Sequence, residues 1–154
     1  MALMEWQDSL ALGVAPMDAT HREFVDQLNA LAAATDEALL GLLDAFIAHT
    51  EAHFAQESVW MRETGFPPTH CHEAEHEGVL GVMRDVRRYV AEGKVHVGRV
   101  LAAELPEWLR NHVATMDGAL AYFMRSIGYD PARPAVPAAG GSDERTGEHP
   151  ALTP

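Results

Sequence analysis

The stretch His-Phe-Ala-Gln-Glu at residues 53–57 places an imidazole and a carboxylate four residues apart. Residues at positions i and i+4 lie on one face of an α-helix, one turn apart. From about residue 36 to 64 that face is otherwise almost entirely apolar; it carries Leu39, Leu43, Phe46, Thr50, His53, Glu57 and Trp60. His53 and Glu57 are therefore predicted to point into a hydrophobic core, where an unpaired charge costs on the order of several kcal/mol.

Three further stretches show the same helical spacing of apolar residues. They run from just after Pro16 to about residue 35, from 69 to about 92, and from 96 to about 127. Runs of β-branched residues with a period of two are absent, so strands are not expected. Four long helices with short connections predict an all-α fold, an up-down-up-down four-helix bundle with an N-terminal arm of about 15 residues packed on its outside.

Helix boundaries have their own signals. Gly65, Gly93 and Gly128 follow the predicted ends of the second, third and fourth helices, a common place for glycine. Asp18 is a candidate N-cap for the first helix. Pro106 is expected to bend or break the fourth helix, because proline lacks the backbone N–H that the helix needs.

The last segment, residues 131–154, differs from the rest of the chain. It holds five of the nine prolines together with Gly140, Gly141 and Gly147, and its large aliphatic residues are Val136 and Leu152. Such a segment buries too little apolar surface to offset the entropy of ordering. We predict a folded domain over residues 1–130 and a disordered C-terminal tail over residues 131–154.

Composition excludes several functional classes. A net charge of −12 repels phosphate backbones and anionic membrane surfaces, so no nucleic-acid partner and no membrane insertion are expected. The single cysteine, Cys71, excludes an internal disulfide framework. The N-terminus lacks a basic secretory signal, and no apolar run approaches the roughly 20 residues of a membrane span. The expected location is cytoplasmic.

Histidines recur on the inward faces of all four predicted helices. His72 and His76 are four residues apart on the third helix, and His21 lies near the start of the first. His112 and Asp117 are five apart on the fourth, about 140° apart on a regular helix, so they converge only if Asp117 reaches round. A single inward-facing histidine is most often an ordinary core residue that forms a hydrogen bond. Five imidazoles and two carboxylates together favour a shared metal site, because cations would offset the buried charge.

The number of ligands indicates more than one ion. A structural zinc ion takes four ligands, and calcium or magnesium prefers oxygen ligands, whereas imidazole with carboxylate suits first-row ions such as iron. In two six-coordinate ions, five imidazoles, two bridging carboxylates and a bridging oxide or hydroxide leave one position open. A redox pair with one open position suits the binding of a diatomic molecule.

Four motifs then resemble the hemerythrin family, specifically its single-domain bacterial members: MDATH at residues 17–21, HFAQE at 53–57, HCHEAEH at 70–76 and WLRNHVATMD at 108–117. The resemblance covers about residues 6–124. It implies a four-helix bundle with two non-haem Fe ions, bridged by oxide or hydroxide, that binds O2 reversibly at one iron.

By this resemblance, His72, His76 and His112 hold one iron, and His21 and His53 hold the other, which keeps the open position. Glu57 and Asp117 bridge the two. An apolar O2 pocket is implied at Phe24, Phe54, Trp108, Leu109 and Val113. The family often has a second acid after the bridging glutamate; here it is Ser58, expected at the surface with little effect.

A different interpretation comes from residues 72–76, which also match the zinc-protease motif H-E-x-x-H with Glu73 as general base. That interpretation leaves the inward residues of the other three helices unexplained. In the bundle interpretation, Glu73 and Glu75 are solvated, Cys71 is a small loop residue or a redox-sensitive thiol, and His49 packs at the bundle end or bonds to the site.

Three uses of a di-iron site remain open: O2 storage or delivery, O2 or redox sensing, and peroxidase or oxidase chemistry. A sensor needs an effector, and the tail shows neither a charge run nor an amphipathic pattern. An enzyme needs proton donors in the pocket, and the implied pocket is apolar. The sequence therefore favours a non-enzymatic O2 carrier, with an unidentified protein as possible recipient of O2 or of a signal.

Overall fold

In the computed structural model, which describes residues 2–132, the boundaries of the longest helix follow from capping signals. α2 (Asp36–Thr64) begins after Thr35, whose hydroxyl accepts a hydrogen bond from the backbone N–H of Ala38 at 3.2 Å. It ends at Gly65, whose φ of +65° is a conformation that residues with a Cβ rarely adopt. The predicted range 36–64 is confirmed.

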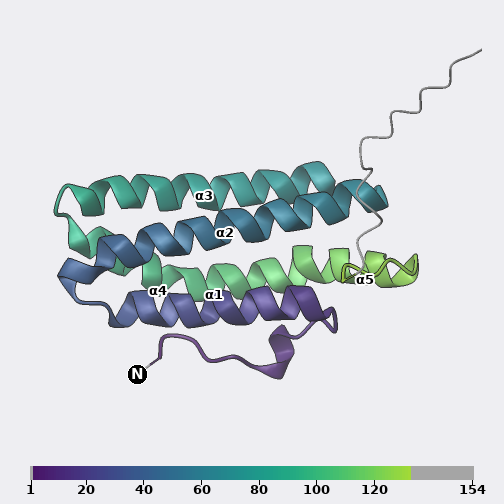
Figure 1. Ribbon diagram of the computed structural model, residues 1–154, viewed down its shortest axis with the longest axis horizontal. Coiled ribbons are helices and arrows are strands. Elements are labelled where there is room, and N and C mark those ends of the chain that lie inside the picture. The colour runs from purple at the N-terminus through teal and green to yellow at the C-terminus, as the bar shows by residue number, and fades with distance from the viewer. Residues whose placement is uncertain (1, 133–154) are drawn as a thin grey trace, which may run out of the picture.

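The helices form a ring of four antiparallel neighbours (Figure 1). After a short 3₁₀ turn, η1 (Asp8–Leu10), come α1 (Ala15–Ala33), α2, α3 (Thr69–Ala91) and α4 (Val95–His112); α4 continues through a π-helical turn, η2 (Val113–Asp117), into α5 (Gly118–Ser126). The prediction of an all-α up-down-up-down bundle is confirmed. Apart from residues 131 and 132, the predicted tail lies outside the described residues. Across residues 2–132, every helix is too short or too polar to span a lipid bilayer.

Two local predictions differ from the structure. The break expected at Pro106 is absent, because α4 runs through this residue to His112. Asp18 does not cap α1, because the helix begins earlier, at Ala15. Its carboxylate instead accepts hydrogen bonds from the backbone N–H groups of Leu12 at 2.8 Å and Gly13 at 3.1 Å, so it ties the arm to the start of the helix.

The N-terminal arm lies along α1, as predicted. The Asn29 side chain accepts from the backbone N–H of Met4 at 3.1 Å and donates to its carbonyl at 2.6 Å. Further along the arm, the Arg22 guanidinium lies 4.8 Å from the centre of the Trp6 ring, an attractive cation–π distance. The arm is thus held by polar contacts at the rim and by the burial of Met4 and Leu10.

The core consists of two apolar clusters. The larger includes Phe24, Phe54, Val79 and Leu109; the smaller includes Met17, Trp60, Met61, Phe66, Leu120 and Met124. Along α1, α2 and the segment from α4 to α5, the buried histidines and carboxylates lie between a member of one cluster and a member of the other; on α3 they lie between Phe66, which precedes the helix, and Val79. On α2, for example, Glu57 lies between Phe54 and Trp60. The polar residues therefore form one layer across the bundle, with hydrocarbon on both sides.

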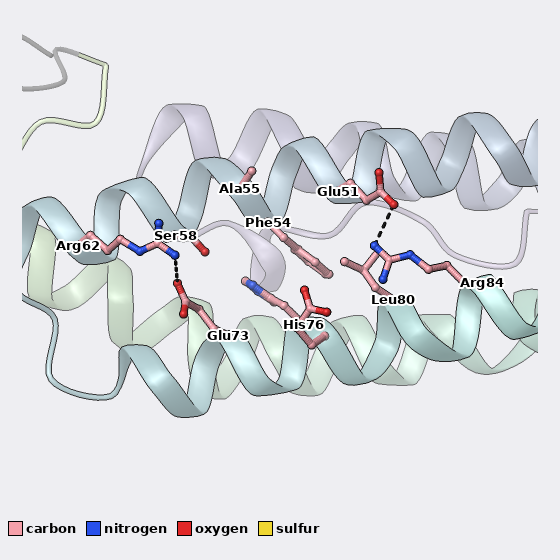
Figure 2. Close-up of a pocket in the computed structure, with 10 residues that line it drawn as sticks. Glu51, Phe54, Ala55, Ser58, Arg62, Glu73, His76, Leu80 and Arg84 are labelled. Carbon is pink, nitrogen blue, oxygen red and sulfur yellow. Dashed lines mark hydrogen bonds and ion pairs between the residues drawn. The ribbon is translucent and has the colours of Figure 1, made fainter. Parts of the chain in front are cut away.

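A groove of about 390 Å³ marks the seam between α2 and α3 (Figure 2). Two ion pairs cross it, Arg62–Glu73 at 3.1 Å and Arg84–Glu51 at 3.0 Å. These exposed pairs contribute little stability each, about 0–1 kcal/mol. Phe54, buried in the larger cluster, and His76, buried at the edge of the polar layer, also line the groove.

We predict that Gly98→Val lowers the free energy of unfolding by about 1–3 kcal/mol, because the bundle is tightly packed there. A Cβ at position 98 would lie 2.9 Å from Val90 Cγ2 and 3.0 Å from Leu39 Cδ2, where α2, α3 and α4 meet. Urea denaturation followed by circular dichroism measures the loss.

Gly78→Val is the matched control, since a Cβ at position 78 on α3 meets nothing within 4 Å. It should leave stability unchanged or slightly higher. Equal effects of the two substitutions would contradict tight packing at position 98.

Candidate metal centre

The seven inward polar residues predicted from the sequence converge in one buried layer. Each is at most 4% exposed: His21, His53, Glu57, His72, His76, His112 and Asp117. α1 supplies one, α2 two, α3 two, α4 one and the π-helical turn one. Their ligand-type atoms form two overlapping groups, within each of which the atoms lie within 4.8 Å of one another.

The π-helical turn brings Asp117 into this layer. On a regular α-helix, residues five apart diverge, so the sequence required Asp117 to reach round from the flank. The backbone instead widens at Val113–Asp117 into a π-helical turn with i to i+5 hydrogen bonds, so residues five apart lie closer to one face than on an α-helix. Asp117 Oδ1 consequently lies 3.1 Å from His112 Nε2.

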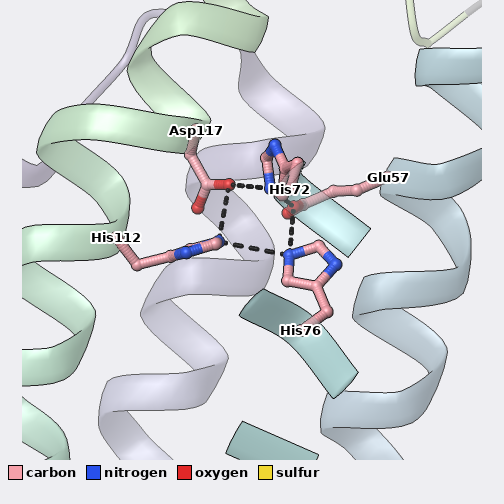
Figure 3. A group of neighbouring side chains, drawn as sticks. All are labelled: Glu57, His72, His76, His112 and Asp117. Atoms are coloured by element: carbon pink, nitrogen blue, oxygen red, sulfur yellow. Dashed lines mark hydrogen bonds and ion pairs between the residues drawn. The ribbon is translucent and has the colours of Figure 1, made fainter. Parts of the chain in front are cut away.

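The two carboxylates divide their oxygens between two groups of imidazoles. Glu57 Oε1 lies 3.2 Å from the Nε2 atoms of both His72 and His76. Asp117 Oδ1 lies 3.1 Å from Nε2 of His72 and of His112 (Figure 3).

The other oxygen of each carboxylate faces the second group. Glu57 Oε2 lies 2.6 Å from His53 Nε2, and Asp117 Oδ2 lies 2.9 Å from His21 Nε2. Each carboxylate thus spans a three-histidine group and a two-histidine group.

Many of these atoms are close without being hydrogen-bonded. The Nε2 atoms of His21 and His53, Glu57 Oε2 and both Asp117 oxygens are buried and have no hydrogen-bond partner among the described residues. Buried polar groups in proteins are nearly always satisfied. Lone pairs that crowd together in this way fit metal coordination, and the set of imidazole and carboxylate ligands suits first-row transition metals.

The electrostatics of the layer favour ionised carboxylates. Burial opposes ionisation, but the imidazoles of His53, His72 and His76 hold the pKa of Glu57 well below its usual range. Burial likewise opposes ionisation of Asp117, and so does the Glu57 charge, yet the close imidazoles of His112, His21 and His72 lower the Asp117 pKa. The balancing positive charge comes from protons on imidazoles or from metal cations.

The same two carboxylates also change the pKa of His72. Burial disfavours its charged form, but Asp117 and Glu57 raise the pKa of His72 to about 9. In contrast, burial and the neighbouring His72 and His112 lower the pKa of His76. Because a metal ligand must be an unprotonated imidazole, metal binding at this layer releases protons, and its affinity falls at low pH.

The five residues of the implied pocket lie on the side of the larger cluster. Phe24, Phe54, Leu109 and Val113 are buried, and Trp108 is half-buried. The Phe54 ring stacks on His76, with centroids 3.7 Å apart, and the Trp108 ring stacks on His112 at 4.6 Å. His76 and His112 are therefore each stacked against an aromatic ring of the pocket.

Sequence reasoning missed Glu75. It was expected to be solvated, but its carboxylate accepts a hydrogen bond from His112 Nδ1 at 2.8 Å and its side chain is 34% exposed. A ligating imidazole usually donates its second N–H to a carboxylate or carbonyl, so an acid beside the histidine pair on α3 was the available signal. Glu73, expected to be solvated like Glu75, instead pairs with Arg62 across the α2–α3 groove.

The structure also locates Ser58, His49 and Cys71. Ser58, expected at the surface, is half-buried and lines the α2–α3 groove with His76. His49 pairs with Glu23 at 2.7 Å, which joins α2 to α1. Cys71 is exposed on α3 and lines a pocket of about 180 Å³ together with His72 and Met116.

Comparison with known proteins agrees with this geometry. The family model described as the hemerythrin HHE cation-binding domain matches residues 12–123. A bacteriohemerythrin of Ralstonia nicotianae is 46% identical over 130 residues, which span 84% of this chain and 95% of that protein. A bacteriohemerythrin of Stenotrophomonas maltophilia is 33% identical over 125 residues, 79% of this chain and 81% of that protein.

Solved structures show the same fold. The crystal structure of a hemerythrin variant with alanine in place of a leucine superposes with a TM-score of 0.74 at 26% identity, covering 80% of this chain and 98% of that one. The range of the family match, residues 12–123, includes all seven residues of the polar layer. The chain belongs to the hemerythrin family.

Proposed function

We propose that this protein binds O2 reversibly at a pair of non-haem iron ions held in the polar layer. The observation that carries the proposal is the division of both carboxylates between the two groups of imidazoles. A carboxylate that offers one oxygen to each side is suited to bridge two cations. The family relationship supports the same conclusion.

The residues take distinct roles in this proposal. His72, His76 and His112 would hold one ion, His21 and His53 would hold the other, and Glu57 and Asp117 would bridge them. When bound, a ferrous pair supplies the two electrons that O2 takes up on binding and returns on release. The two-histidine side has fewer protein ligands, so it is the side with room for O2.

The apolar neighbours determine whether binding is reversible. None of Phe24, Phe54, Leu109, Val113 and Trp108 carries an acidic proton at neutral pH, and four of the five are buried. They exclude water and protons, which would otherwise favour irreversible oxidation. This supports a carrier, not an enzyme. A lone exposed thiol at Cys71 suits a reducing compartment, so the proposed location is cytoplasmic.

The central test is optical. Ferrous protein exposed to O2 should develop charge-transfer absorption in the near-ultraviolet and visible, and the band should disappear when O2 is removed under vacuum. Metal analysis of the same sample should give two irons per chain. A band that forms only irreversibly would contradict the carrier and favour an oxidase or redox sensor, and zinc content without colour would contradict the di-iron site.

Leu109→Tyr tests the pocket. Leu109 is 1% exposed, and a tyrosine there adds a hydroxyl to the hydrocarbon wall. We expect oxidation of the O2-bound form to accelerate by about tenfold, equivalent to roughly 1.4 kcal/mol in the barrier. Stopped-flow absorbance records the decay of the band.

Leu109→Phe is the matched control for the added ring, because it differs from the tyrosine variant by the hydroxyl alone. The phenylalanine variant should decay several times more slowly than the tyrosine variant. If both variants keep the wild-type lifetime, position 109 does not line the O2 site.

His112→Ala tests the ligand assignment. Removing one imidazole leaves the buried Glu57 and Asp117 charges with weaker compensation, so the variant should retain less iron per chain. It should also lose about 3–5 kcal/mol of stability in the iron-loaded state. Iron content and urea denaturation measure the two effects.

His96→Ala serves as the control because His96 is exposed near the start of α4. It should keep both iron content and stability. Wild-type iron stoichiometry in His112→Ala would remove His112 from the ligand set.

A further inference from the structure

Among the five site histidines, His112 alone has a hydrogen-bond acceptor for its second ring nitrogen within residues 2–132. Its Nδ1 lies 2.8 Å from Glu75 Oε1. The Nδ1 atoms of His21, His53, His72 and His76 are buried and have no partner in the described part of the chain. The two sides of the site therefore differ in their number of histidines, and the histidines differ in whether Nδ1 has a hydrogen-bond acceptor.

We propose that Glu75 is a positioning residue that fixes the tautomer and the ring orientation of His112 and strengthens its Nε2 as a metal ligand. With the proton held on Nδ1 by the carboxylate, the Nε2 lone pair faces Glu57, Asp117 and the other imidazoles. Partial transfer of charge from the carboxylate into the ring makes Nε2 a better donor. This inference rests on the ligand set of the proposed function.

The surroundings of Glu75 direct its charge to His112. Its ion pair among the described residues is with His112, and no described Arg or Lys competes for it. Glu73, two residues earlier on the same helix, instead forms an ion pair with Arg62. Of the two acids in residues 72–76, Glu75 therefore contacts a histidine of the polar layer, and Glu73 contacts an arginine at the helix surface.

Packing completes the orientation of the ring. Trp108 stacks on the His112 ring with an interplanar angle of 12°, and His72 meets it edge-on at 80°. These contacts define the plane of the ring, but they leave open which nitrogen carries the proton. When Nε2 binds a cation, the Glu75 hydrogen bond holds the proton on Nδ1, because a carboxylate accepts and cannot donate.

The exposed side of Glu75 opens on a groove of about 350 Å³ between α3 and α4, lined also by Val79, Leu105 and Trp108. Water can reach the carboxylate from this groove, so its charge costs less than that of a fully buried acid. The fully buried Glu57 has no such outlet. Glu75 therefore lies beside the site, in contact with His112 on one side and with the groove on the other.

The test compares Glu75→Leu and Glu75→Gln in the full chain, loaded with Zn2+ so that O2 chemistry plays no part. Glu75→Leu removes the acceptor, and we expect zinc affinity, measured by chelator competition, to fall by roughly 10- to 100-fold. Glu75→Gln keeps an acceptor without the charge, so its loss should be smaller. In ¹⁵N-edited spectra, the slowly exchanging His112 Nδ1–H signal should persist in wild type and disappear in Glu75→Leu.

Glu73→Leu is the matched control, because it removes the same charge from the same helix at a residue that contacts Arg62. It should keep zinc affinity and the His112 signal. Equal losses in Glu73→Leu and Glu75→Leu would overturn the proposal, as would wild-type affinity with an unchanged His112 signal in Glu75→Leu.

Folding of the zinc-free variants is followed by circular dichroism. If Glu75→Leu fails to fold, Glu75→Gln becomes the test. Wild-type zinc affinity together with a disturbed His112 Nδ1–H signal would overturn the role of Glu75 in metal binding. A reduced zinc affinity with a shifted signal would support that role. If the iron protein fails to bind O2 reversibly while the zinc results hold, the proposed function fails and the role of Glu75 stands.

Discussion

Two carboxylates buried at the centre of a helical bundle are the constraint on which the rest of the structure depends. Glu57 and Asp117 are fully buried, and their pKa values are held low by the imidazoles around them. Charges of this kind are tolerated in a protein interior only when opposite charge lies beside them. Each of the four long helical segments supplies part of that balance, so the bundle and the candidate metal centre cannot be separated energetically.

The two apolar clusters make this polar layer possible. One lies on each side of it, and α1, α2 and the segment from α4 to α5 each pass from one cluster through the layer to the other. Hydrocarbon on both sides keeps water away and strengthens the electrostatic interactions within the layer. It also means that the net charge of −12 overstates what the surface carries, because Glu57 and Asp117 face inward.

Much of the fold could be predicted because helical periodicity is local information. The ranges of α2 and α3, the arm and the ring of four helices follow from apolar spacing and from glycines at helix ends. The seven polar residues of the layer could also be found, since a histidine or carboxylate on an apolar stripe is conspicuous. Asp18 and Pro106 were misjudged because their effects depend on where the arm lies and on how the helix adapts around a proline.

The sequence by itself determined which side chains face inward and what chemistry they offer, because facing follows from residue spacing along a helix. Tertiary structure decided how these side chains meet. It widened the backbone at Val113–Asp117 so that Asp117 reaches the layer, divided the carboxylate oxygens between two groups, and turned Glu75 to His112 while Glu73 turned to Arg62. These outcomes depend on distances between helices, which no spacing within one helix specifies.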